Sequence, residues 1–254
     1  MNQPTKINNL LASQPPGVVF LAEWMVANGY SWHLQKAYRE GSWLESIGIG
    51  AMIRASTKIT YEGAIYALQN QASQTIHPGG LSALAILGKG HNLEEYTKFI
   101  YFYGSTYETF PVWFRGHDWG IDYEYHSTLF LPPDEGLIDH ETGSFSIKIS
   151  SPERAIMECL HIAPIHISIV ECYEVMKCLN NLPIKSVQNL LEKCKSFKVK
   201  RLFLYLAEKA GHAWFHKLDL SRIRTGKGKR SITRNGVYIG KYQMTVPKEI
   251  ANIT

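Results

Sequence analysis

The chain has 254 residues, 45% of them hydrophobic and 12% aromatic, so it can bury the cores of two domains, which excludes a largely disordered protein. Its net charge is +5 at pH 7. No apolar run approaches the roughly 20 residues of a membrane span, and the N-terminus lacks the basic-then-apolar pattern of a secretion signal. We therefore expect a cytoplasmic protein with no membrane partner.

The first third of the chain has the pattern of a winged helix-turn-helix. Residues 5–13, 18–28 and 32–40 each show the apolar spacing of a short helix. Gly29 suits the C-terminal cap of the second helix, and Ser31 suits the N-terminal cap of the third. Residues 43–54 place two apolar segments around a Gly-Ile-Gly turn, which predicts a hairpin. Three short helices followed by a hairpin predict the winged motif.

The remaining chain predicts strands and then helices. Helices are expected at 61–72 and 81–87 and strands at 99–103, 112–114, 123–130 and 145–149. Further helices are expected at 152–162, 169–181, 186–196 and 200–210. We place a domain boundary near residue 90. The fold class is α+β, with a winged helix-turn-helix domain at 1–90 and a larger mixed α/β domain at 91–254.

The third helix is the element that enters the major groove in a winged helix. Leu34, Ala37 and Tyr38 suit its buried face, so its polar side chains are expected outward. Gln pairs with adenine, Arg with guanine and Lys with phosphate or guanine, while a helix N-terminus binds phosphate. The expected DNA-binding residues are Ser31, His33, Gln35, Lys36 and Arg39, with Arg54 and Lys58 near the hairpin.

Two other interpretations of this helix stay open. Its polar face can simply be solvated, and winged helices also bind proteins. Residues 1–90 carry six Lys/Arg against four Asp/Glu, a balance of +2. That surplus is small for DNA binding, because affinity depends strongly on the neutralisation of phosphates.

The later charge is strongly asymmetric. Residues 91–184 carry five Lys/Arg against fourteen Asp/Glu, whereas residues 185–234 carry fourteen against three. Two basic tracts, at 193–201 and 222–234, are interleaved with aromatic residues. This pattern is typical of nucleic-acid backbone binding or of docking to an acidic protein. Neutralisation between the two segments, or a solvated basic face, explains it as well.

No catalytic or cofactor motif is recognisable. The glycine pairs lack a dinucleotide fingerprint and a P-loop, and the four cysteines contain no C-x-x-C pair. His161 and His166 flank Pro164 and do not share a helix face. Four carboxylates of the middle segment match no metal template: Asp118, Asp122, Glu124 and Asp134. We therefore expect no enzyme activity, no catalytic residue, no metal and no cofactor; metal-dependent cleavage of nucleic acid is the alternative to test.

Several longer stretches carry a family resemblance. They are "YREGSWLESIGIGAMIR" (38–54), "EGAIYALQNQ" (62–71), "IHPGGLSALAILGKGH" (76–91), "KVKRLFLYLAEKAGHAWFHKLDL" (198–220), "GKGKR" (226–230) and "YQMTVPKEI" (242–250). In this order and spacing they resemble the AbiEi-type antitoxins and transcriptional regulators of bacterial type IV toxin–antitoxin systems. The resemblance spans nearly the whole chain.

The resemblance implies a function for each domain. The winged helix, with recognition helix 31–40 and wing 44–54, would bind double-stranded operator DNA at its own promoter and repress it. The C-terminal antitoxin domain would counteract a co-encoded nucleotidyltransferase toxin, without needing a stable complex. Its matched surface residues, for toxin or nucleic-acid backbone, are Lys198, Lys200, Arg201, His212, Lys229 and Arg230. A stand-alone winged-helix regulator without a toxin is the alternative.

Overall fold

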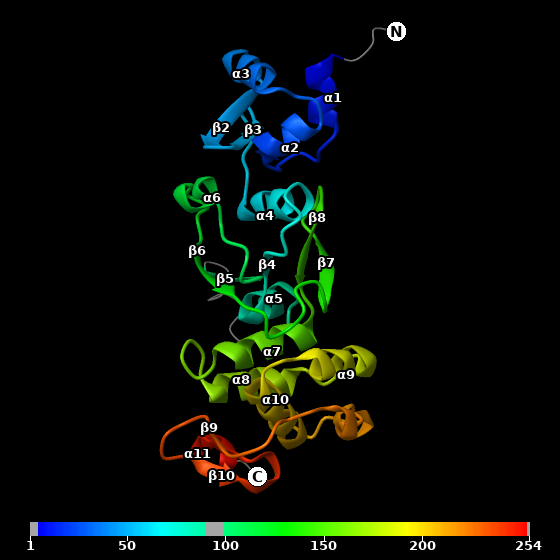
Figure 1. Cartoon of the computed structure of the whole chain (residues 1–254), viewed down its shortest axis with the longest axis vertical. Coiled ribbons are helices and arrows are strands. Elements are labelled where there is room, and N and C mark those ends of the chain that lie inside the picture. Colours follow the sequence, from blue (N-terminus) through cyan, green and yellow to red (C-terminus); the bar gives the residue numbers. More distant parts are fainter. Residues whose placement is uncertain (1–4, 90–98, 253–254) are drawn as a thin grey trace. The chain divides into compact units, whose positions relative to one another are not determined.

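The computed structural model describes residues 5–89 and 99–252 (Figure 1). Contacts between Cα atoms divide the chain into two compact units. The first unit is Met1–His77, Gly104–Ile121 and Asp139–Lys148, and the second is Pro78–Tyr103, Asp122–Ile138 and Ile149–Thr254. The boundary expected near residue 90 lies outside the described residues, and the domains 1–90 and 91–254 stay a prediction. No helix of the described ranges is long and apolar enough to cross a membrane.

The first unit contains the predicted winged helix. Its helices are α1 (Lys6–Ala12), α2 (Ala22–Ala27) and α3 (Trp32–Glu40). Its strands β1 (Phe20–Leu21), β2 (Leu44–Gly48) and β3 (Ala51–Arg54) form an antiparallel sheet of order β1-β3-β2. The prediction of a winged helix-turn-helix is therefore confirmed.

Local signals set the ends of α2 and α3. Gly29 has a φ of +85° just after α2, a conformation that favours glycine. The Ser31 hydroxyl accepts a hydrogen bond from the Leu34 N–H at 3.3 Å and caps α3. The expected start of the second helix at residue 18 was wrong. Phe20 and Leu21 instead pair with Met52 and Ala51 of β3.

One apolar cluster holds the winged helix together. It joins α1, α2, α3 and the sheet, and its buried members are Ile7, Leu10, Phe20, Ala22, Met25, Tyr30, Tyr38, Leu44 and Met52. Burial of each large side chain contributes about 1.5–3 kcal/mol. Helices this short are marginal alone, so their stability comes from this shared core.

Helix α4 (Tyr61–Asn70) follows, and two glutamines of the "ALQNQ" stretch bind backbone. The Gln71 carboxamide accepts from the Leu21 N–H at 2.8 Å and donates to the Val19 carbonyl at 2.7 Å. The Gln69 carboxamide accepts from the Lys148 N–H at 2.8 Å and donates to the Lys148 carbonyl at 3.0 Å. These bonds tie α4 to two segments distant in sequence, one of them leading into the winged helix.

Helix α6 (Val112–Gly116) corrects an expected strand at 112–114. The backbone N–H groups of Phe114 and Arg115 both donate to the Pro111 carbonyl, which closes a helical turn. Phe114 also stacks on Phe110, with ring centroids 3.9 Å apart. Three apolar residues do not distinguish helix from strand, and here the preceding proline and the aromatic packing favour the helix.

Two further sheets occupy the middle of the chain. Strands β4 (His77–Pro78), β5 (Phe99–Gly104) and β6 (Asp122–Ser127) form a three-stranded sheet of that order. Strands β7 (Leu137–Glu141) and β8 (Ser146–Ser150) form a pair. The strands expected at 99–103, 123–130 and 145–149 are confirmed, whereas β7 was not foreseen.

The second unit is mainly helical. Helices α5 (Gly80–Ile86), α8 (Ile169–Cys178), α9 (Ile184–Lys193) and α10 (Phe197–Lys209) pack around α7 (Pro152–Ile162), as Figure 1 shows. The ends of the last four expected helices differ from the observed ends by at most three residues. These helices and the C-terminal segment share one large apolar core.

A small C-terminal sheet was not predicted. Strands β9 (Arg230–Ser231), β10 (Val237–Ile239) and β11 (Met244–Val246) have the order β10-β11-β9, and helix α11 (Lys248–Ala251) follows. Short 3-10 helices η2 (Phe215–Lys217), η3 (Leu220–Arg222) and η4 (Gly240–Tyr242) join these parts. Two- and three-residue strands carry too little alternation to be read from sequence.

The "HPGG" stretch meets a buried ion pair. The Glu158 carboxylate is fully buried and accepts hydrogen bonds from the Gly80 N–H at 2.9 Å and from the Ser150 hydroxyl at 2.7 Å. A Cβ added at Gly79 would lie 2.3 Å from its Oε2. The Arg154 Nε lies 2.7 Å from Glu158 Oε1 and completes the pair. Glycine is therefore required where the backbone approaches this carboxylate.

This ion pair generates a stability prediction. Arg154→Met should lower the free energy of unfolding by about 3–5 kcal/mol, because it leaves the Glu158 charge buried without its partner. Lys148→Met is the matched control, since its ion pair with Asp139 is exposed and worth about 0–1 kcal/mol. Denaturant unfolding of both variants measures the difference. Equal losses would contradict a special role for the buried pair.

Candidate nucleic-acid interface

Helix α3 presents a polar and aromatic face to solvent. Its exposed residues are Trp32, His33, Lys36, Ala37, Arg39 and Glu40. Trp32, Lys36 and Arg39 are spaced by four and three residues, so they lie along one side of the helix. The Lys36–Glu40 ion pair of 3.7 Å is highly exposed and is worth little, so a phosphate or base can replace it.

Gln35 does not lie on this face. The prediction that it points outward was wrong, because its side chain is fully buried. Its Nε2 donates to the Tyr30 carbonyl at 2.8 Å and to the Ala22 carbonyl at 3.0 Å. Gln35 therefore fixes α3 against α2 and the turn between them and is unable to read a base. Ala37, expected on the buried face, is instead exposed.

The wing is braced on two sides. The Arg54 Nη2 donates to the Leu11 carbonyl of α1 at 2.7 Å, so this guanidinium is occupied within the fold rather than extended towards a phosphate. A Cβ added at Gly48, where φ is +146°, would lie 2.8 Å from the Cβ of Trp113 in α6. The tip between the strands carries Ile49, which is 89% exposed. Lys58 is exposed beyond β3 and lines a shallow hollow with Thr60 and Glu62.

Four of the six residues expected on the antitoxin surface are structural. Lys200, Arg201 and His212 are buried, and Lys198 is half-buried. The Lys198 ammonium donates to the carbonyls of His161 and Ala163. Burial lowers the pKa of Lys198 and of Lys200 from the usual lysine value. The His212 Nε2 lies 2.7 Å from the Met176 carbonyl oxygen. Burial removes Lys200, Arg201 and His212 from a binding face, and the two hydrogen bonds to carbonyls occupy the Lys198 ammonium.

Arg201 organises the loop before β9. Its Nε donates to the Thr225 carbonyl at 2.9 Å, its Nη1 to the carbonyls of Gly228 and Gln243 at 2.8 and 2.9 Å, and its Nη2 to the Gly226 carbonyl at 3.1 Å. Gly226 has a φ of +76°, and a Cβ there would lie 2.6 Å from the Phe197 ring. The loop backbone is thus drawn inward around one guanidinium.

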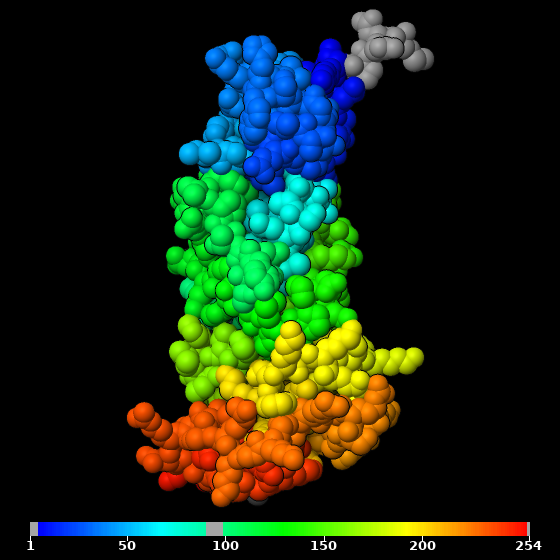
Figure 2. Space-filling model, in the orientation of Figure 1, coloured from blue at the N-terminus to red at the C-terminus, as the bar shows by residue number. Residues whose placement is uncertain are grey.

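The side chains of this loop face solvent. Lys227, Lys229 and Arg230 are exposed, and the segment lies at the surface in the orange part of the chain (Figure 2). The Lys229 ammonium lies 5.3 Å from the centroid of the exposed Tyr238 ring, and the Arg230 guanidinium lies 5.6 Å from that of Phe197. Cations over partly exposed aromatic rings provide both charge and a stacking surface. We call Lys227, Lys229 and Arg230 the basic loop.

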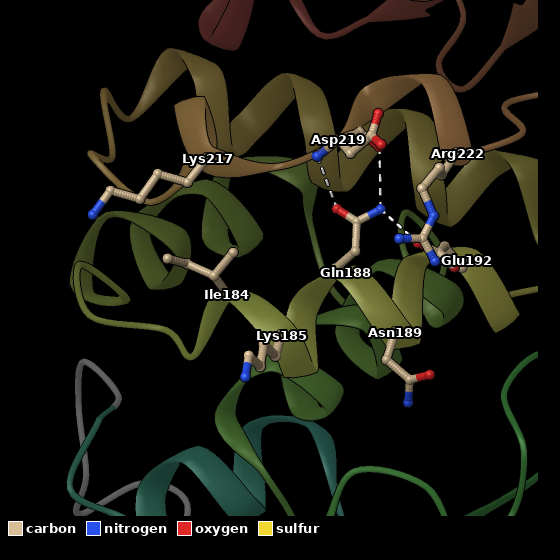
Figure 3. Close-up of a pocket in the computed structure, with 8 residues that line it drawn as sticks. All are labelled: Ile184, Lys185, Gln188, Asn189, Glu192, Lys217, Asp219 and Arg222. Atoms are coloured by element: carbon tan, nitrogen blue, oxygen red, sulfur yellow. Dashed lines mark hydrogen bonds and ion pairs between the residues drawn. The ribbon is translucent and has the colours of Figure 1, made fainter.

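A polar hollow of about 370 Å³ lies between α9 and the η2–η3 segment (Figure 3). Gln188 crosses it, donating to the Asp219 carbonyl at 3.1 Å and accepting from the Asp219 N–H at 3.0 Å. Arg222 pairs with Glu192 at 2.9 Å on the same side. Because these polar and charged side chains bind one another or the backbone, the hollow gives no reason to assign a cofactor to it.

Sequence reasoning missed Trp32, whose side chain is 59% exposed. The four-residue spacing to Lys36 is a usable signal, because it places both on one face of the helix. The polar face expected of α3 is otherwise present, with His33, Lys36 and Arg39 exposed as predicted. Ser31, also expected to bind DNA, caps the N-terminus of this helix.

These features define a protein in which a braced winged helix is combined with a helical α/β unit that exposes a basic loop. Family models match nearly the whole chain: residues 3–95 match the N-terminal domain of the AbiEi antitoxin transcriptional regulators, and residues 97–247 match "Transcriptional regulator, AbiEi antitoxin, Type IV TA system". The chain therefore belongs to the AbiEi family of type IV toxin–antitoxin antitoxins, which are transcriptional regulators.

A solved structure supports the fold. The crystal structure of the RV2827C protein from Mycobacterium tuberculosis is similar to this chain, with a TM-score of 0.57 over 94% of this chain and 89% of that chain. At 14% identity the similarity shows the fold alone. No curated protein matches the chain.

The placement of Gln35 is testable. Gln35→Ala should lower the free energy of unfolding by about 1–3 kcal/mol, because two buried carbonyls lose their donor. His33→Ala, on the exposed face of the same helix, should change it by at most about 0.5 kcal/mol. Thermal or denaturant unfolding measures both. Full stability in Gln35→Ala together with lost DNA preference would instead show that Gln35 reads a base.

Proposed function

We propose that this chain binds the promoter of its own operon through α3 and represses transcription there. The observation that carries the proposal is the exposed side of α3, where Trp32, Lys36 and Arg39 are aligned, while the buried Gln35 beside this row anchors the helix to the fold. Arg reads guanine edges, and Lys binds phosphate or guanine. A helix held rigidly by its scaffold keeps such side chains in register with base pairs.

The N-terminus of α3 supports the same geometry. Ser31 uses its hydroxyl to bind the Leu34 N–H, which leaves the first helical N–H groups at the solvent-exposed end of the helix. Such groups, together with the helix dipole, attract a phosphate. The exposed Trp32 ring and the side chain of His33 flank this position. A phosphate contact here would set how deeply α3 enters the groove.

The proposed antitoxin activity is to counteract a co-encoded nucleotidyltransferase toxin. The basic loop supports it, because three exposed cations and two aromatic rings suit an acidic protein surface or a nucleic-acid backbone. The contact can be transient, since exposed charges contribute more to the rate of encounter than to lasting affinity. A neighbouring gene for a nucleotidyltransferase would separate this function from that of a stand-alone winged-helix regulator.

The exposed face of α3 gives the main functional prediction. Lys36→Ala with Arg39→Ala should reduce the preference for operator over scrambled duplex by at least about tenfold, since each lost base contact is worth about 1–3 kcal/mol. Competition binding at constant salt measures the preference. Lys177→Ala with Lys185→Ala is the control, because it removes the same charge from exposed positions of the second unit. An unchanged preference in the α3 variant would reject α3 as the reading helix.

The basic loop gives a second prediction. Replacing Lys227, Lys229 and Arg230 by Ser should weaken the protective interaction by about ten- to a hundredfold, because three exposed charge contacts are together worth about 1–3 kcal/mol. Colony counts after co-expression with the toxin measure protection. The control is the same replacement at Lys177, Lys185 and Lys217, which are exposed elsewhere in the second unit. Equal protection by both variants would place the antitoxin surface elsewhere.

A further inference from the structure

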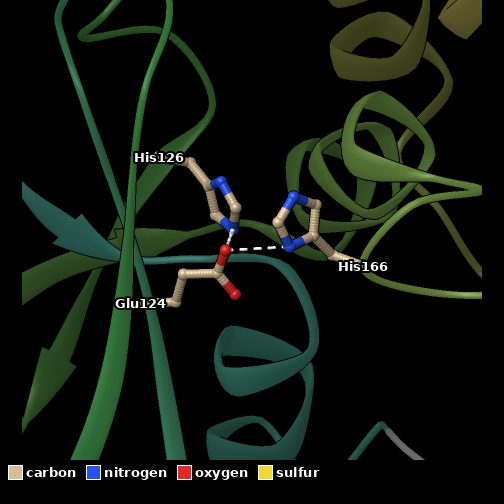
Figure 4. A group of neighbouring side chains, drawn as sticks. All are labelled: Glu124, His126 and His166. Atoms are coloured by element: carbon tan, nitrogen blue, oxygen red, sulfur yellow. Dashed lines mark ion pairs between the residues drawn. The ribbon is translucent and has the colours of Figure 1, made fainter.

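Three potential metal ligands converge in the second unit (Figure 4). Glu124 and His126 both lie on β6, two residues apart, so their side chains point to the same face of the sheet. His166 comes from the connection between α7 and α8. The Glu124 Oε1 lies 2.8 Å from the His166 Nδ1 and 3.6 Å from the His126 Nε2, and all three atoms lie within 4.8 Å of one another.

Aromatic packing fixes the orientation of His126. Its ring stacks on Tyr101 with centroids 6.0 Å apart and an interplanar angle of 16°, and it lies 5.2 Å from the Tyr103 ring. The His166 ring approaches it edge-on at 5.1 Å. The side chain of His126 is only 14% exposed, whereas those of Glu124 and His166 are 33% and 39% exposed. The aromatic rings therefore hold His126 in place, while Glu124 and His166 face solvent on the open side of the cluster.

The bond between Glu124 and His166 accounts for only part of this arrangement. The Nε2 of His126 is buried and makes no hydrogen bond, and the Glu124 oxygen at 3.6 Å is too far away to accept one. Leaving a buried polar nitrogen without a hydrogen-bond partner is unfavourable. An ion placed among the three side chains would satisfy this nitrogen and use the carboxylate charge at the same time.

We propose that Glu124, His126 and His166 bind one Zn²⁺ ion through one carboxylate oxygen and two imidazole nitrogens, with solvent at the fourth position. Tetrahedral Zn²⁺ with bonds of about 2.0–2.2 Å places its ligand atoms about 3.3–3.6 Å apart. The 3.6 Å separation already fits, and the 2.8 Å separation must widen by less than about 1 Å. Two imidazoles favour Zn²⁺ over Mg²⁺ and Ca²⁺, which prefer oxygen ligands.

The site was not recognised from the sequence. The carboxylates considered there were Asp118, Asp122, Glu124 and Asp134, and of these only Glu124 belongs to the cluster. Bound Zn²⁺ would tie β6 to the connection between α7 and α8, so it would stabilise the second unit by an amount that rises with the logarithm of the Zn²⁺ concentration above the dissociation constant. The proposal uses no property of the DNA-binding face and is independent of the proposed function.

The test is Zn²⁺ binding to the full chain, without an affinity tag and after treatment with a chelator. Titration calorimetry, with the metal content measured after gel filtration, should give one Zn²⁺ per chain. Thermal unfolding should show a melting temperature that rises with the Zn²⁺ concentration. His166→Ala, in a half-exposed position, should lower the affinity at least about tenfold. Glu124→Gln keeps an acceptor for His166 but loses the charge, and should weaken binding similarly.

The matched control is His216→Ala, which removes an exposed histidine elsewhere in the second unit and should leave Zn²⁺ affinity unchanged. Intense visible absorption on Co²⁺ substitution would support a four-coordinate site. The proposal is overturned if the wild-type chain retains no Zn²⁺, or if His166→Ala and Glu124→Gln both bind it as tightly as the wild-type chain does.

Discussion

The position of α3, the helix proposed to read DNA, depends on the hydrogen bonds of the Gln35 carboxamide. Its two hydrogen bonds, to the carbonyls of Ala22 and Tyr30, connect α3 to the first residue of α2 and to the turn that follows α2. Both bonds are buried, so water does not compete with them. The angle between the two helices is therefore fixed, and the outward direction of Trp32, Lys36 and Arg39 follows from it.

Polar side chains also bind backbone groups inside the fold in the stretches that carry the family resemblance. Gln69 and Gln71 bind backbone groups of distant segments, and Arg201 binds four carbonyls around the basic loop. Gly79 allows the backbone to approach the buried Glu158 carboxylate. Gln69, Gln71 and Arg201 form hydrogen bonds to backbone groups of other segments. This explains why polar side chains that the sequence suggests for binding lie inside the fold. The residues proposed to bind a partner are exposed on the segments that these bonds hold, such as the basic loop.

Much of the winged helix could be predicted because its signals are local. The cap at Ser31, the left-handed Gly29 and the glycines of the wing act within a few residues of their positions. The burial of Gln35 could not be predicted, because its partners are set by tertiary packing. The same holds for Lys200, Arg201 and His212. A lysine-rich stretch predicts a solvated face, and the four carbonyls that bind Arg201 come from segments distant in sequence. The pairing of Glu124 with His126 follows strand alternation, but no sequence spacing points to His166.

DNA reading by α3 is best tested by measuring how the full chain binds its own upstream DNA, compared with a scrambled duplex of the same composition, across a salt series. We expect a clear preference for the upstream DNA that persists as salt rises, while affinity for both duplexes falls with a slope set by the number of phosphates contacted. Equal affinity for the two duplexes at every salt concentration would contradict it. The exposed face of α3 would then be a surface for protein rather than for DNA.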